Sequence, residues 1–113
     1  MHTFNIDYSQ VGTTTIFKIT GELDASTCIT ADYWLQKVIA MPVTAIAVDC
    51  EQMKYISSAG IGVLIACYHA CEKKGITLSI HGVKPNVKNV FEILGLDKVL
   101  DIKPCLQQSL KSA

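Results

Sequence analysis

Hydrophobic and polar positions alternate over several short stretches of the chain, which is the pattern of strands with one buried face. The clearest example is at the start, where Phe4, Ile6 and Tyr8 alternate with polar residues before a turn at residues 10–12. By contrast, residues 44–48 are almost all apolar, as expected for a strand that is covered on both faces. The predicted strands are residues 4–9, 13–20, 44–48, 76–80 and 99–100.

Between these strands, apolar residues recur every three or four positions, which predicts helices. The first helix presents Ala31, Leu35 and Val38 on one face, and Pro42 prevents it from continuing. The second, at residues 59–74, is apolar on most of its surface and is expected to be heavily buried. Two further helices are predicted at residues 85–94 and 104–111.

The order of these elements predicts the fold class. After an N-terminal hairpin, strands alternate with helices, so the later strands are expected to be parallel and joined by right-handed crossovers. The sequence therefore predicts an α/β protein with a mixed sheet of four to five strands and about four helices. The chain has 113 residues and no repeat or linker, so residues 1–113 are expected to form a single domain.

Composition and charge exclude several functional classes. Ten lysines balance ten acidic residues and there is no arginine, which makes the chain a poor candidate for binding nucleic acid. The longest apolar stretch, residues 61–67, is far shorter than the roughly 20 residues that span a bilayer. Residues 1–5 lack the basic start and apolar core of a signal peptide. We therefore expect no nucleic-acid binding and no membrane insertion.

The cysteines favour a reducing compartment. There are five, an odd number without the spacing of a disulfide framework, so a cytoplasmic location is expected. Cys67 and Cys71 would share one face of a helix, but no second pair of ligands lies nearby at a suitable spacing. We expect them to be small buried hydrophobes and predict no metal site.

Functional groups in α/β proteins gather in the loops beyond the carboxyl ends of the parallel strands. Residues 49–58 form the most unusual of these loops, because Ser57 and Ser58 precede an apolar helix whose first turn contains Gly60 and Gly62. In a structural interpretation, one serine caps the helix and the glycines allow close packing. In a functional interpretation, the absent side chains leave a serine and backbone N–H groups open, and the helix N-terminus would stabilise a phosphate there.

Three features of the chain occur together in one known family. They are the tetrapeptide Gly21-Glu22-Leu23-Asp24, Asp49 at the end of a buried strand, and residues 55–64, which read Tyr-Ile-Ser-Ser-Ala-Gly-Ile-Gly-Val-Leu. In these features and in its order of elements the chain resembles the STAS domain, and more narrowly the anti-sigma factor antagonists of bacteria. The resemblance implies a STAS-like fold and a binding protein, not an enzyme, whose unmodified form binds an anti-sigma factor and thereby frees a sigma factor.

The resemblance also implies a phosphorylation switch. The expected partners are an anti-sigma factor that is also a serine kinase of the histidine-kinase-like ATPase type, and a serine phosphatase. Ser58 is the expected phosphorylated residue, and Ser57 is the alternative, because many members have Asp where this chain has Ser57. ATP and magnesium are expected on the kinase, so no cofactor is expected here. The phosphosite environment or partner surface is expected to include Asp24, Asp49, Met53, Tyr55, Ser57, Ala59, Gly60 and Gly62.

Several of these residues have a structural alternative. Asp24 and Asp49 either orient the serine or contact the partner, or they bond nearby backbone N–H groups at a turn and a strand end. Met53, Tyr55 and Ile56 form an apolar anchor if exposed and pack the loop if buried.

Other functions stay open at this point. STAS domains also occur as accessory subunits of lipid-transport complexes and in stressosomes. A small cytoplasmic enzyme would use Cys50, or Ser58 with a histidine from elsewhere in the chain, but no pair of nucleophile and base is recognisable in the sequence. A purely structural interaction domain would use its serine only as a helix cap.

Overall fold

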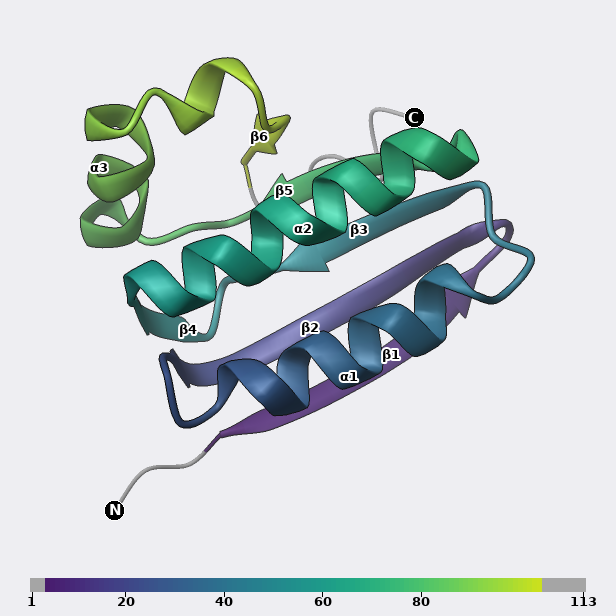
Figure 1. The fold of residues 1–113 in the computed structure, drawn as a ribbon, viewed down its shortest axis with the longest axis horizontal. Coiled ribbons are helices and arrows are strands. Elements are labelled where there is room, and N and C mark those ends of the chain that lie inside the picture. The colour runs from purple at the N-terminus through teal and green to yellow at the C-terminus, as the bar shows by residue number, and fades with distance from the viewer. Residues whose placement is uncertain (1–3, 105–113) are drawn as a thin grey trace.

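The computed structural model describes residues 4–104, in which helices pack on one mixed sheet (Figure 1). The elements in chain order are β1 (Asn5–Val11), β2 (Thr14–Leu23), α1 (Cys28–Ile39), β3 (Ala45–Asp49), β4 (Met53–Ile56), α2 (Ser58–Lys74), β5 (Thr77–His81), α3 (Pro85–Ile93), the 3-10 helix η1 (Leu96–Lys98) and β6 (Ile102–Lys103). The predicted α/β class, the N-terminal hairpin and the parallel later strands are confirmed.

The sheet has six strands, one more than the upper end of the prediction. Its order is β1-β2-β3-β5-β6, and β4 pairs with β2 outside this path. The hairpin pair β1–β2 is antiparallel, whereas the other strand pairs are parallel. Helices α1 and α2 lie side by side on one face of the sheet, and α3 lies beyond the end that carries β4 (Figure 1).

The core lies between this face and the two helices. Alternate residues of β2, among them Phe17 and Ile19, are fully buried, as are Ile46 and Val48 of β3. The predicted face of α1 is buried throughout, which confirms the helical periodicity. The most buried residues of α2 are Gly60, Ile61, Leu64, Cys67 and Cys71. No helix among residues 4–104 is long and apolar enough to cross a membrane.

The main error of the sequence prediction concerns β4 and the end of β2. The sequence predicts a loop at residues 49–58 and a second strand that ends at residue 20. Instead β2 continues to Leu23, because Gly21 adopts a φ of 100° and the register shifts between Gly21 and Glu22. Glycine tolerates such a conformation, and the resulting bulge carries β2 away from β3 and alongside β4.

Smaller differences concern turns and termini. The hairpin turn is formed by Gly12 and Thr13, so β1 includes Val11. The last described strand is β6, and the predicted strand at residues 99–100 is wrong, because Leu100 is buried in the core just after η1. Three α-helices lie within the described residues. The predicted helix at residues 104–111 falls mainly outside them, as does Cys105.

Candidate functional site

The two serines lie where β2, β4 and α2 meet. Strand β4 ends at Ile56, Ser57 follows in an extended conformation as the N-cap of α2, and Ser58 is the first residue of the helix. The N–H of Ser57 donates a hydrogen bond of 2.9 Å to the carbonyl oxygen of Leu23. The end of β2 therefore fixes the position at which α2 begins.

The two serine hydroxyls differ in their surroundings. The Oγ of Ser57 accepts a hydrogen bond of 3.4 Å from the N–H of Gly60, and the side chain is half-buried. Ser58 is exposed, and its hydroxyl takes part in none of the hydrogen bonds within residues 4–104. Ser57 therefore has the capping role that the structural interpretation assigned to one of the serines, whereas the hydroxyl of Ser58 faces solvent.

The two glycines of the first turn also differ. A Cβ on Gly60 would lie 2.6 Å from the carbonyl oxygen of Leu23 and 2.9 Å from Cγ1 of Ile56, so no larger residue fits without displacing the helix. A Cβ on Gly62 would meet no atom within 4 Å, and this residue is exposed. The predicted close packing is therefore confirmed for Gly60 and wrong for Gly62.

The start of α2 has the electrostatic character of an anion site. Its first turn contains no acidic residue. The backbone N–H groups of Ser58 and Ala59 donate no hydrogen bond within the part of the chain that the structure describes. Such unpaired N–H groups, together with the helix dipole, stabilise negative charge at a helix N-terminus.

Asp24 follows Leu23 directly and therefore lies beside the start of α2. Its carboxylate accepts hydrogen bonds from the hydroxyl of Ser26 at 2.7 Å, from the N–H of Ser26 at 2.9 Å and from the N–H of Thr27 at 3.2 Å. The hydroxyl of Ser26, aided by these N–H groups, holds the pKa of Asp24 below its ordinary value. Asp24 thus has the predicted turn chemistry and carries a negative charge near the serines, without bonding to either of them.

Asp49 lies elsewhere in the sheet. It is only 9% exposed, and its carboxylate accepts a hydrogen bond of 3.1 Å from the N–H of Glu51. In the register of the sheet it stands between Lys18 of β2 and His81 of β5. Because its neighbour Val48 points into the core under the helices, the Asp49 side chain lies on the other face. The structure therefore does not bring Asp49 and the serines together.

The residues before the serines form a strand, not an exposed loop, and this corrects one predicted contact. Met53 is completely buried and Ile56 nearly so, because β4 packs against the core. Met53 therefore packs the interior and cannot be part of a surface anchor. Tyr55 is 48% exposed and remains available to a partner, and Ala59 is half-buried.

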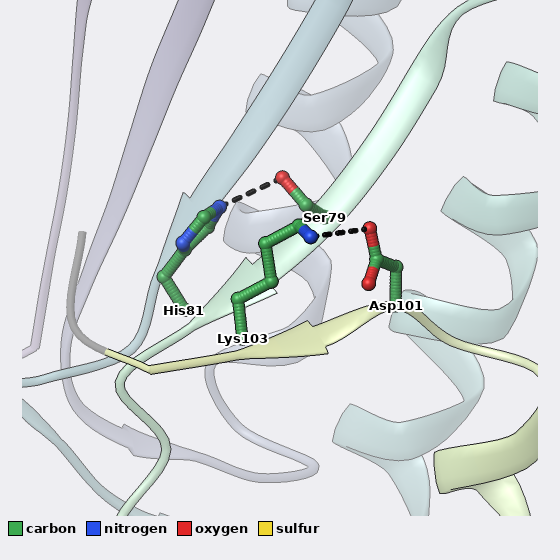
Figure 2. A network of polar contacts seen from close by, with 4 residues as sticks. All are labelled: Ser79, His81, Asp101 and Lys103. Carbon is green, nitrogen blue, oxygen red and sulfur yellow. Dashed lines mark hydrogen bonds and ion pairs between the residues drawn. The ribbon is translucent and has the colours of Figure 1, made fainter. Parts of the chain in front are cut away.

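A second polar cluster lies on β5 and β6, and sequence reasoning missed it (Figure 2). The Nε2 of His81 is 2.7 Å from the hydroxyl oxygen of Ser79, and Lys103 forms an ion pair of 3.4 Å with Asp101. Burial, and then the charge of Lys103, lower the pKa of His81, while Asp101 and Asp49 oppose this shift. The available signal was the spacing of two residues between Ser79 and His81, which places both on one face if the strand predicted at residues 76–80 continues by one residue.

His81 and Cys50 do not form a pair of nucleophile and base with Ser58 within the described residues. His81 approaches Ser79 and not Ser58, and its Nδ1 has no hydrogen-bond partner within the described part of the chain. Cys50 is completely buried, and burial raises the pKa of its thiol, which opposes formation of a nucleophilic thiolate. Within residues 4–104 no three His, Cys, Asp or Glu side chains are grouped so that they could hold a metal ion.

Comparison with known proteins agrees with this architecture. An anti-sigma-B factor antagonist of Listeria monocytogenes is 25% identical over 85 residues, which are 75% of each chain. An anti-sigma factor antagonist from Mycobacterium paratuberculosis superposes with a TM-score of 0.86 and 21% identity, covering 97% of this chain and 93% of the other. The phosphorylated form of the Bacillus cell fate determinant SpoIIAA gives a TM-score of 0.74 and 18% identity, covering 97% and 98%.

These solved structures share the fold of the chain at low sequence identity. The model of one protein family, the STAS domain, matches residues 5–109, which include every strand and helix described above. The chain therefore belongs to the STAS domain family.

Proposed function

We propose that this protein is an anti-sigma factor antagonist, a binding module whose unmodified form binds an anti-sigma factor and frees a sigma factor. Family membership supports a binding role, and the similarity to the Listeria antagonist extends over 75% of both chains. The buried Cys50 and the absence of a base beside Ser58 within residues 4–104 argue against an enzyme. The proposed place of action is the cytoplasm.

Phosphorylation of Ser58 is the proposed switch. The observation that carries this assignment is the division of roles at the start of α2, where Ser57 caps the helix and Ser58 presents an unbonded hydroxyl to solvent. Gly62 lies one turn further along the helix and places no side chain beside Ser58. A kinase therefore has access to the hydroxyl of Ser58 without having to break the cap.

The switch would act through charge at the centre of a contact surface. A phosphate on Ser58 adds about 1.5 to 2 negative charges, and the N–H groups at the helix start would accommodate it without refolding. The chain has no arginine to clamp the phosphate, and Asp24 adds a second negative charge nearby. A partner surface that packs against Tyr55 and the unmodified serine would meet an uncompensated anion after phosphorylation.

The partners follow from this scheme. The anti-sigma factor would also be the serine kinase, of the histidine-kinase-like ATPase type, and would supply ATP and magnesium. A serine phosphatase would restore the binding form. No cofactor is required on the antagonist itself.

Affinity measurements with the candidate kinase from the same genome test this function. We expect Ser58→Ala to bind at least as tightly as the wild type and Ser58→Asp to bind about 100-fold more weakly, a difference of about 2.7 kcal/mol. Thr77→Asp is the matched control, because Thr77 is exposed at the start of β5, three residues after the end of α2 that lies opposite Ser58. This variant adds the same charge and should bind normally.

Two results would contradict the proposal. One is equal affinity of Ser58→Ala and Ser58→Asp for the kinase. The other is phosphate located by mass spectrometry on Ser57, or on neither serine, after incubation with the kinase and ATP. Purification of the protein with a transporter ATPase would instead favour an accessory subunit of a lipid-transport complex.

A further inference from the structure

Within residues 4–104, strand β1 is an open edge of the sheet. It is the outermost strand on its side, and six of its seven residues are exposed. Edge strands are usually protected by lysine, proline, a bulge or a covering helix, because their free N–H and C=O groups attract other strands. The sequence of β1 has neither lysine nor proline, its pairing with β2 is unbroken, and Asp7 is its one charged residue.

The hairpin geometry shows which backbone groups point outward. Gly12, with a φ of 64°, and Thr13 form a two-residue turn in which Val11 and Thr14 are paired. A hydrogen bond from the N–H of Thr14 to the carbonyl of Val11 closes such a turn. Because hydrogen-bonded pairs alternate along an antiparallel ladder, every second residue before Val11 directs its N–H and C=O away from β2. These outward residues are Ile6, Tyr8 and Gln10.

Aromatic side chains gather beside this edge. The ring of Tyr8 lies 6.1 Å from that of Trp34 on α1, and Trp34 lies 5.3 Å from Tyr33 in an edge-to-face contact. All three rings are partly exposed, at 37%, 36% and 53% for Tyr8, Trp34 and Tyr33. We call these three residues the aromatic edge. Exposed apolar patches of this kind mark interaction surfaces.

We propose that β1 and the aromatic edge form the interface of a homodimer, in which β1 pairs antiparallel with β1 of a second copy around a two-fold axis at Tyr8. This register pairs all seven residues of the strand and uses the outward groups of Ile6, Tyr8 and Gln10. It places Asp7 opposite Ser9 of the partner subunit, a hydroxyl that can donate to the carboxylate. A two-fold axis moved to Asp7, which shifts the register by two residues, would bring two like charges together.

A second copy of the chain suits this surface better than an unrelated strand, because β1 and the aromatic edge of each copy would contact the same residues of the other copy. A two-fold axis at Tyr8 sets Asp7 opposite Ser9 and not opposite a second Asp7, and it would bring the two aromatic edges to the same face of a continuous sheet. A standard interface covers about 800 Å² per partner, which is about one-eighth of the 6410 Å² surface of this chain. Burial of three aromatic rings supplies the apolar centre that such an interface needs.

The proposed dimer leaves the serine site open. Figure 1 shows that β1 borders the sheet on the side away from α2, which carries Ser58. The dimer would therefore present two switch sites at once. The inference does not rest on the anti-sigma function, since it depends only on the edge strand and its aromatic residues.

Sedimentation equilibrium of the wild type from 5 to about 300 μM tests the proposal, with circular dichroism to verify folding. We expect a dimer whose dissociation constant rises at least tenfold in Tyr8→Lys. Gln10→Pro should have the same effect, because it removes an outward N–H and spares the pairing with β2. The matched control is Ile93→Lys, which changes an exposed apolar residue on α3 and should remain dimeric.

A wild type that stays monomeric over this range would overturn the proposal. So would a dimer that persists unchanged in both folded edge variants, since it would then use another surface. If one edge variant fails to fold, the other decides the result. Loss of the dimer in Ile93→Lys would place the interface on α3 and would also contradict the assignment.

Discussion

The starts of α1 and α2 carry similar sequences but differ in how their polar groups are used. At α1, the carboxylate of Asp24 accepts hydrogen bonds from Ser26 and Thr27, and these bonds occupy the N–H groups before the helix. At α2, no acidic residue takes this place, Ser57 accepts one long hydrogen bond, and the hydroxyl of Ser58 is unbonded within residues 4–104.

The difference lies in the hydroxyl groups: those of Ser26 and Thr27 are hydrogen-bonded at α1, although α1 has no side-chain cap, whereas that of Ser58 is unbonded within residues 4–104. At α1 the carboxylate of Asp24 supplies a negative charge beside the helix start. At α2 the N–H groups of Ser58 and Ala59 are still available. A phosphate on Ser58 would therefore supply at α2 the negative charge that Asp24 supplies at α1.

The largest expected effect on stability concerns the glycines that distinguish α2. Gly60→Ala should lower the free energy of unfolding by about 2–3 kcal/mol, because the added methyl group overlaps the backbone of β2. Gly62→Ala is the matched control and should raise it by about 0.5–1 kcal/mol, since the new side chain meets no atom and glycine is a poor helix residue. Urea unfolding measures both. Equal effects at the two positions would show that α2 does not begin against Leu23.

Substitutions of the two serines should differ in their effect on the free energy of unfolding. Ser57→Ala removes the cap and should cost about 0.5–1 kcal/mol, because the hydrogen bond to Gly60 is long. Ser58→Ala removes an unbonded, exposed hydroxyl and should change the free energy of unfolding by less than about 0.5 kcal/mol. A larger loss in Ser58→Ala than in Ser57→Ala would reverse the roles assigned to the two residues.

The smallest effect on stability is expected for a substitution of Asp24 at the start of α1, and this effect should depend on pH. The pKa of Asp24 is lower in the folded state than in the unfolded state, so its charged form stabilises the fold at any pH above the unfolded pKa. This contribution is lost as the pH falls through the folded pKa. Asp24→Asn should therefore melt slightly below the wild type at pH 7. The difference should stay constant down to about pH 5 and shrink below about pH 4, near the ordinary Asp pKa. A difference that grows in acid would contradict the assigned hydrogen bonds.

Much of this fold could be predicted from the sequence because its main signals are local. The periodicity of α1 and α2, the apolar run of β3 and the glycine at the end of α2 each specify their element without knowledge of its neighbours. Strand β4 could not be found in this way. It has four residues, and it exists because the end of β2 lies beside it after the bulge at Gly21.

The same limit applies to the candidate site. The serines and glycines are adjacent in sequence, so their place at a helix start was predictable. Which serine caps and which is exposed depends on the residue at which the helix begins, and this is set by the contact of Gly60 with Leu23. The burial of Met53 follows from the pairing of β4 with β2, which no local pattern of residues encodes.

Strand β2 pairs with two different strands along its length, and this affects the free energy of local opening at the serine site. Residues 14–18 of β2 pair with β3, whereas residues 21–23 pair with β4. Opening of β4 from β2 would therefore leave the pairing of the main sheet intact but would expose Met53 and Ile56, and its free energy would be only part of the global value. A kinase that draws Ser58 into its active site would work against this local stability and not against that of the whole domain.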